Sequence, residues 1–271
     1  MIYSSCCQQK CNQVAHGAPS QAAHHDMLHG RRLTGDFGGD LVKRFLDDAS
    51  NSVAPAALVL DVGANQGNWG HDVLLRLLRR TRRTPPRHVA RLVSFEPQPQ
   101  YLSNLLRQAR EWNASHLPRS SWTVLPFAAW KEATNLTFYL SKFTEASSLV
   151  AEQALAFSDP GPWCEGNASA CIRPVSVPAI DFASYLHAAL GPPGTVWPVM
   201  LKLDVEAAEY DVLPSLLVSG ALCAISHIFI ECTSSEAGMR GLPDSQPLPR
   251  SPLTLARSIV LASSPAGPKG I

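Results

Sequence analysis

The chain has 271 residues, of which 45% are hydrophobic and 17% are charged, and its formal net charge is +1. This length and apolar share suit one large α/β domain with tails and exclude a wholly disordered chain. The near-neutral charge gives no reason to expect a nucleic-acid partner, and seven cysteines are too few and too scattered for a disulfide scaffold. No apolar run approaches the roughly 18 residues that a membrane-spanning helix needs.

Composition divides the chain into three parts. Residues 1–35 mix glutamine, histidine, serine and glycine without a period, so we expect a disordered lead-in. The folded domain is expected over residues 36–235, with an irregular insertion at residues 151–174. Prolines accumulate and apolar periodicity fades in residues 236–271, which predicts a disordered tail.

Within the domain, apolar runs of strand length alternate with segments of helical period. The expected strands are residues 58–62, 91–96, 122–127, 199–205 and 225–231. One helix is expected to begin near residue 41, and four more are expected over residues 69–78, 101–112, 180–190 and 210–218. This alternation predicts a mostly parallel, twisted sheet with helices on both faces, which is the Rossmann-like α/β class.

Two features of the expected sheet are less regular. Residues 136–140 and 147–150 have the pattern of a strand pair, and we expect them to form a hairpin on the otherwise parallel sheet. No further strand is indicated after Glu231, so we expect the closing antiparallel strands with which such sheets normally finish to be missing.

The end of the first strand carries the strongest chemical signal. Asp61 is followed by a turn with Gly63 and Gly67, and a helix begins directly after it. Glycines at such a turn let the backbone approach a ligand, and open α/β sheets bind ligands at the carboxyl ends of their strands. Glu96 ends the second strand, where its carboxylate can accept hydrogen bonds from both hydroxyls of a ribose. The sequence therefore predicts a nucleoside-containing cofactor at this edge.

Two cofactors share this layout, and spacing and charge separate them. A dinucleotide fingerprint, G-x-G-x-x-G, holds a pyrophosphate on backbone amides, but the middle glycine is absent between Gly63 and Gly67. Asn65 stands where the pyrophosphate would press closest, and Asp61 would repel it. The same carboxylate favours the positively charged S-adenosylmethionine, which is the expected cofactor. An NAD-dependent oxidoreductase is the less favoured alternative.

Four ordered motifs carry a resemblance to a known family. They are Asp61-Val-Gly-Ala-Asn-Gln-Gly67, Phe95-Glu-Pro97, Ala128-Ala129 and Lys202-Leu-Asp-Val-Glu-Ala-Ala-Glu-Tyr210. Together they resemble the FkbM family of S-adenosylmethionine-dependent methyltransferases, over about residues 58–231. The resemblance implies O-methylation of a hydroxyl, with a sugar, a glycan or another small natural product as the acceptor.

Position in these motifs implies a contact for each part of the cofactor. The residues that would line its amino-acid half are Asp61, Gly63, Ala64, Asn65 and Gly67. Glu96 would take the ribose, and Phe127 and Ala128 would border the adenine. One departure is Ala207, which stands where the family has a glycine after Val-Glu and would crowd a close backbone approach.

Methyl transfer needs an in-line nucleophile, and a base that removes the proton of a hydroxyl assists it. Lys202, Asp204 and Glu206 alternate along one expected strand, so their side chains should share a face beside the cofactor turn. Asp204 and Glu206 are the candidates for base or substrate orienter, and Lys202 for steering a carboxylate or pairing with Asp204. The alternative is a structural ion-pair cluster. These carboxylates could also hold Mg²⁺, although nothing in the spacing requires a metal.

Several alternatives stay open. Ala207, the proline-rich end and the missing closing strands favour a truncated or non-catalytic family member that acts as a binding module. The arginines of residues 79–91 could contact a nucleic acid, but without interleaved aromatic residues a solvated connector is favoured. The lack of a signal-like segment favours the cytoplasm. Cys164 and Cys171, with acceptor patterns at Asn113, Asn135 and Asn167, would instead fit the lumen of the secretory pathway. Nothing in the sequence indicates the oligomeric state.

Overall fold

The structure is a computed structural model, and it describes residues 39–52, 56–81, 89–141, 147–156, 172–190, 198–232 and 257–262. The expected lead-in and most of the expected tail lie outside these residues, as do Cys164 and Cys171.

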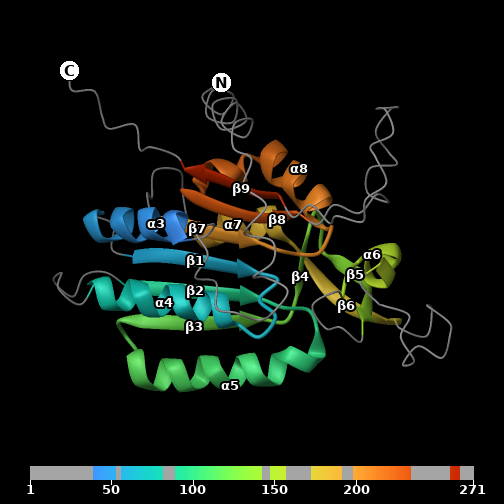
Figure 1. The fold of residues 1–271 in the computed structure, drawn as a ribbon, viewed down its shortest axis with the longest axis horizontal. Helices are drawn as coiled ribbons and strands as arrows, with labels where there is room; N and C mark the ends of the chain where they lie inside the picture. Colours follow the sequence, from blue (N-terminus) through green and yellow to red (C-terminus); the bar gives the residue numbers. More distant parts are fainter. Residues whose placement is uncertain are drawn as a thin grey trace.

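A six-stranded sheet in the order β3-β2-β1-β7-β8-β9 forms the centre of the fold (Figure 1). Its parallel strands are β1 (Ala56–Val62), β2 (Val89–Phe95), β3 (Ser120–Leu125), β7 (Val199–Leu203) and β8 (His227–Cys232). Every residue of β1 is buried, as in a strand that is covered on both faces. The Rossmann-like α/β fold with a mostly parallel sheet is therefore confirmed.

Helices cover both faces of this sheet and make two separate cores. The helices on the first face are α3 (Gly39–Asn51), α4 (Asn68–Thr81) and α5 (Pro99–His116). The helices on the second face are α7 (Phe182–Leu190), α8 (Glu209–Ser219) and the 3-10 helix η5 (Ala221–Ala224). Neighbouring residues of β1 enter different cores, with Val59 on the α4 side and Leu60 on the α8 side. Position along a strand thus decides which face a side chain reaches.

The sheet ends in an antiparallel strand, β9 (Arg257–Ala262), which pairs with β8 along its whole length. The expectation that no closing strand follows Glu231 is therefore wrong. These six residues of the expected tail belong to the main sheet. This strand could not be predicted from the sequence, because a long proline-rich stretch separates it from β8.

A second sheet of three strands stands beside the carboxyl ends of the main strands (Figure 1). Its strands, in spatial order, are β4 (Ala128–Trp130), β6 (Ile172–Asp181) and β5 (Thr134–Ser141). The expected place of the strand pair on the main sheet is therefore wrong, because β5 pairs with β6 in this second sheet. The two expected segments do meet, at an isolated antiparallel bridge between Tyr139 and Ser148. Both ends of the segment 151–174 are also regular, since they form α6 (Ala151–Ala156) and the start of β6.

Two element boundaries differ from the expected ones. The helix expected from Ile180 begins at Phe182, where the Asp181 carboxylate accepts the Ser184 amide at 3.0 Å and caps the helix. The strand expected to reach Val205 ends at Leu203, the last residue of β7. The other expected strands and helices of the main sheet are present with shifted ends.

A side chain of α5 covers the outer edge of β3. The Asn113 Nδ2 atom donates to the Trp122 carbonyl at 2.8 Å, and Asn113 Oδ1 accepts the Trp122 amide at 2.8 Å. Trp122 is buried, and its indole nitrogen donates to the Ser94 hydroxyl at 3.0 Å. The acceptor pattern at Asn113 therefore lies in a contact between helix and strand, which a sugar chain on this amide would break.

Candidate functional site

A cavity that is partly open to solvent lies between the carboxyl ends of the main strands and the second sheet. The predicted site residues on its wall are Gly63, Asn65, Glu96, Phe127, Ala128, Asp204 and Glu206. The predicted residues that are not on its wall are Asp61, Ala64, Gly67 and Lys202.

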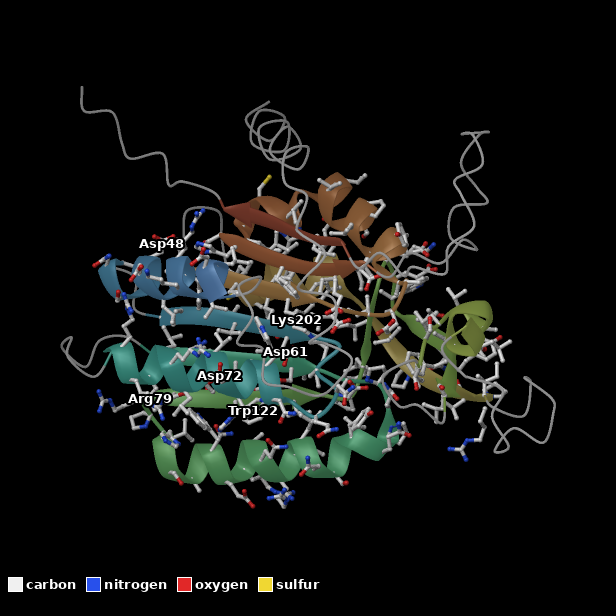
Figure 2. The ribbon with its side chains drawn as sticks, in the orientation of Figure 1. Asp48, Asp61, Asp72, Arg79, Trp122 and Lys202 are labelled. Atoms are coloured by element: carbon white, nitrogen blue, oxygen red, sulfur yellow. The ribbon has the colours of Figure 1, made fainter. Side chains whose placement is uncertain are left out.

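Asp61 and Lys202 lie behind the wall, in the interior of the fold (Figure 2). They are register partners on neighbouring strands. Two residues earlier on each strand, Val59 and Met200 belong to the core on the α4 side. Because side chains two apart on a strand share a face, Asp61 and Lys202 point toward α4 and reach the cavity only through their neighbours.

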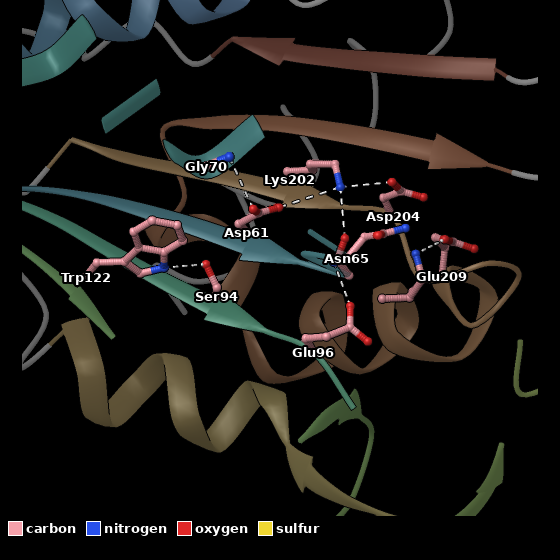
Figure 3. Close-up of polar contacts among 11 residues, drawn as sticks. Asp61, Asn65, Gly70, Ser94, Glu96, Trp122, Lys202, Asp204 and Glu209 are labelled. Atoms are coloured by element: carbon pink, nitrogen blue, oxygen red, sulfur yellow. Dashed lines mark hydrogen bonds and ion pairs between the residues drawn. The ribbon is translucent and has the colours of Figure 1, made fainter. Parts of the chain in front are cut away.

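The Lys202 ammonium is shared between the ends of two strands (Figure 3). Its Nζ atom lies 2.9 Å from an Asp204 carboxylate oxygen and 3.6 Å from Asp61 Oδ1. It also donates to the Gly63 carbonyl at 3.1 Å. Burial alone would lower the pKa of Lys202, but the charges of Asp204 and Asp61 raise it above its ordinary value, so the group stays cationic. The pairing of Lys202 with Asp204 that the sequence suggested is thus present, and Asp61 shares the same ammonium group.

Asp61 is fully buried and supports the start of α4. Its Oδ2 atom accepts the Gly70 amide at 3.2 Å. Burial raises the pKa of Asp61, and the charge of Lys202 opposes that rise. A Cβ atom at position 70 would lie 2.7 Å from the Asp61 carboxylate, so this glycine allows a contact inside the protein.

Glu96 is the buried carboxyl group on the cavity wall, with 1% of its surface exposed. Its Oε2 atom accepts the Asn65 amide at 2.6 Å (Figure 3). Its Oε1 atom accepts the Gln98 amide at 2.8 Å. Burial raises the pKa of Glu96 to about 7, although the two amide hydrogen bonds act in the opposite direction. A cation or hydroxyl donors in the cavity would favour its ionised form.

Four backbone amides of the first turn are bonded to protein atoms. Gly63 and Ala64 both donate to the Phe95 carbonyl, at 3.1 and 3.0 Å. The Gly67 amide donates to the Ala64 carbonyl at 2.7 Å, and the Asn65 amide is held by Glu96. These are amides that a dinucleotide-binding turn would offer to a pyrophosphate. The turn is therefore poorly suited to a diphosphate.

A tight turn follows β7 and carries Glu206 to the cavity wall. Asp204 and Glu206 do not alternate along a strand as expected, because β7 ends at Leu203. Glu206 and Ala207 have φ angles of +50° and +77°, and the Ala208 amide donates to the Val205 carbonyl at 3.3 Å. These features are typical of a type I′ turn, which glycine, asparagine and aspartate favour. At position 207 this backbone conformation disfavours alanine.

Two buried side chains hold this turn from outside. The Ser148 hydroxyl donates to the Glu206 carbonyl at 2.6 Å, and Glu209 Oε1 accepts the Val205 amide at 2.7 Å. Glu209 is fully buried, and burial raises its pKa to about 7. Burial and the charge of Asp204 also raise the pKa of Glu231, on β8, to about 7.

Part of the wall comes from residues that the sequence did not single out. Phe138, Ser147 and Leu149 reach the cavity from β5 and the segment after it. Their only sequence signal is the strand-like pattern of residues 136–140 and 147–150, which indicates strands but not the sheet to which they belong. Strand β5 and the segment after it therefore contribute a side of the site that no motif marks.

Among the described residues, no group of three or more His, Cys, Asp or Glu side chains is placed to hold a metal ion. None of the helices in the described ranges is long and apolar enough to cross a membrane.

A family model described as the methyltransferase FkbM domain matches residues 61–246, which is more than half of the chain. The match begins at the end of β1 and includes every residue that lines the cavity. The comparison with curated proteins finds no match.

Replacement of Gly63 by alanine tests the packing of the two turns. A Cβ atom there would lie 1.7 Å from the Asp204 carbonyl oxygen, at a φ of +78°. We expect Gly63→Ala to lower the free energy of unfolding by about 3 kcal/mol or more, as measured by denaturant unfolding. Gly39→Ala is the control, because a Cβ atom there meets nothing within 4 Å. Equal stability of the two variants would contradict the contact.

Replacement of Glu209 by glutamine tests its raised pKa. The pKa is about 7 in the fold against 4.5 for a free side chain, so the folded state binds a proton that the unfolded state releases. The stability from this proton is present below the lower value and is lost as the pH rises through the higher one. Between pH 5 and 8 the wild type should therefore lose about 2 kcal/mol more than Glu209→Gln, measured by urea unfolding at each pH. Glu111→Gln, which removes an exposed carboxylate from α5, is the control. Parallel pH profiles of Glu209→Gln and the wild type would refute the shift.

Proposed function

Because the chain belongs to the FkbM methyltransferase family, we propose that it transfers the methyl group of S-adenosylmethionine to a hydroxyl oxygen of a sugar, a glycan or another small natural product. The observation that carries this proposal is the buried Glu96 carboxyl on the wall of the cavity, beside a turn whose amides are bonded to protein atoms. This pairing suits a nucleoside without a diphosphate.

The residues on the wall fit the parts of this cofactor. Glu96 would accept the ribose hydroxyls, with Phe127 and Ala128 at the adenine. Gly63 and Asn65 would contact the amino-acid half. S-adenosylmethionine, when bound, supplies an electrophilic methyl group on a positively charged sulfur.

The remaining predicted residues fit a positioning role. Asp61 and Lys202 fix the two turns from behind, and the Ala64 and Gly67 amides shape the first turn. None of these four residues lies on the cavity wall.

The charge of the wall supports a cationic cofactor and a neutral acceptor. Glu96, Asp204 and Glu206 line the cavity, and no lysine, arginine or histidine among the described residues does so. Carboxylates attract a sulfonium group and repel an acceptor that carries a phosphate or a carboxylate.

Asp204 and Glu206 have different surroundings, which suggests different roles. The Lys202 ammonium holds the Asp204 carboxylate in place, so Asp204 is suited to accept a hydrogen bond from the acceptor hydroxyl and to orient it. Glu206 lies on the turn at the cavity wall, and we assign it the removal of the hydroxyl proton. The hydroxyl oxygen then forms its bond to the methyl carbon as the bond between carbon and sulfur breaks.

A non-catalytic family member that acts as a binding module is the second candidate. The left-handed conformation of Ala207, between two residues of the cavity wall, is the observation that favours it. The missing closing strand no longer supports it, because β9 closes the sheet.

Calorimetry with S-adenosylhomocysteine tests the cofactor. We expect the wild type to bind and Glu96→Ala to bind at least about tenfold more weakly, a loss of about 1.4 kcal/mol, because the ribose loses its acceptor. Glu132→Ala, which removes an exposed carboxylate, should bind like the wild type. Equal binding by all three proteins would remove Glu96 from the site.

Glu206→Gln tests the chemical step. We expect kcat to fall at least about 100-fold, because a glutamine cannot take the hydroxyl proton, while the affinity for S-adenosylhomocysteine stays within about threefold. The measurement is transfer of a labelled methyl group to a panel of neutral hydroxyl acceptors. An unchanged kcat would assign the proton to another group, and absence of transfer by the wild type despite cofactor binding would favour the binding module.

A further inference from the structure

The turn that carries Glu206 is strained. Glu206 and Ala207 both have positive φ angles. This left-handed conformation disfavours residues with a Cβ atom, and neither side chain has the short polar group with which asparagine or aspartate stabilises it. Such a turn persists only where contacts from outside hold it. Residues outside the turn must therefore supply the contacts that restrain it.

Ser148 supplies the contact that comes from the second sheet. Its hydroxyl donates to the Glu206 carbonyl at 2.6 Å, across 58 residues of sequence. The donor is itself fixed, because Ser148 is fully buried and its oxygen accepts the Val150 amide at 3.0 Å. Its backbone pairs with Tyr139 of β5 in both directions, at 2.8 and 3.2 Å. The carbonyl at the centre of the strained turn is thus anchored to the bridge between Ser148 and Tyr139 of β5.

The same short segment also touches the cavity. Ser147 and Leu149, on either side of Ser148, line the wall opposite the main strands. Glu206 and Ala208 line it from the turn. The hydrogen bond from Ser148 to Glu206 therefore joins two parts of the wall that are distant in sequence.

We propose that Ser148 is a positioning residue of the methyl-transfer site, whose hydroxyl holds the turn so that the Glu206 carboxylate faces the transferred group. The role of Glu206 in this inference rests on the proposed function, whereas the restraint of the turn does not. A ligand that contacts Ser147 or Leu149 would change the position of Glu206 through the hydrogen bond from Ser148.

Hydrogen exchange tests the restraint without any ligand. In Ser148→Ala we expect the amides of residues 204–209 to exchange at least about tenfold faster than in the wild type, because the turn leaves its strained shape. Ser120→Ala is the matched control: this serine is also fully buried and bonded to a side chain, Trp112, but it lies at the start of β3. Equal exchange in the wild type and Ser148→Ala would overturn the restraint.

Two cofactor analogues test the position of the carboxylate. Sinefungin carries an amine where S-adenosylmethionine carries its methyl group, whereas S-adenosylhomocysteine carries nothing there. We expect the wild type to bind sinefungin more tightly than S-adenosylhomocysteine, because the Glu206 carboxylate faces the amine. In calorimetry the ratio of the two affinities should fall at least about fivefold in Ser148→Ala. It should stay at the wild-type value in Ser120→Ala. A general loss of packing would weaken both ligands alike and would overturn the proposal.

Ala207→Gly provides the rescue, because glycine adopts positive φ without strain. Alone it should raise Tm by about 2–4 °C. In the Ser148→Ala/Ala207→Gly double variant the preference for sinefungin should return to the wild-type value, since the turn no longer needs its anchor. This comparison also serves if Ser148→Ala alone does not fold, and a double variant that lacks the preference would count against the proposal. Failure of the wild type to bind either ligand would refute the proposed function, and hydrogen exchange would still decide the role of Ser148.

Discussion

One buried ammonium group, that of Lys202, fixes the floor of the cavity. It contacts Asp61 at the end of β1, Asp204 after β7 and the Gly63 carbonyl of the first turn. In an interior of low dielectric constant such a cation is stable only with its partners, and loss of one leaves a charge unpaired at a cost of about 3–5 kcal/mol. Together with the hydrogen bond from the Asp204 amide to the Val62 carbonyl, this nitrogen atom joins the two turns at the ends of β1 and β7.

The main sheet could be predicted because its elements are encoded locally. The continuous apolar run of β1 and the helical period of α4 each arise within a few residues of sequence. The second sheet could not be predicted in the same way. β4 has only three residues, β6 contains Pro174 and Pro178, and the pairing of β5 with β6 depends on contacts distant in sequence. β9 was missed for the same reason, because its partner strand lies beyond a proline-rich stretch.

The site shows the same division. The position of Glu96 could be predicted, because a residue directly after a parallel strand lies at the ligand edge wherever its side chain turns. The direction of Asp61 could not, since it depends on which core its strand neighbours enter. The prediction that Asp204 and Glu206 alternate along one strand was wrong, because β7 ends two residues before the expected strand end. The hydrogen bond from Ser148 to Glu206 could not be predicted from the sequence, because the two residues are 58 positions apart.

The contact between Asn113 and Trp122 has a consequence for how molecules of this protein meet. The edge of a sheet exposes unpaired amides and carbonyls that can recruit a strand from another copy. An asparagine side chain carries one donor and one acceptor group, so Asn113 satisfies Trp122 as the backbone of a further strand would. A helix residue thereby closes the β3 edge at this point, and protection against edge-to-edge aggregation there comes from one amide group.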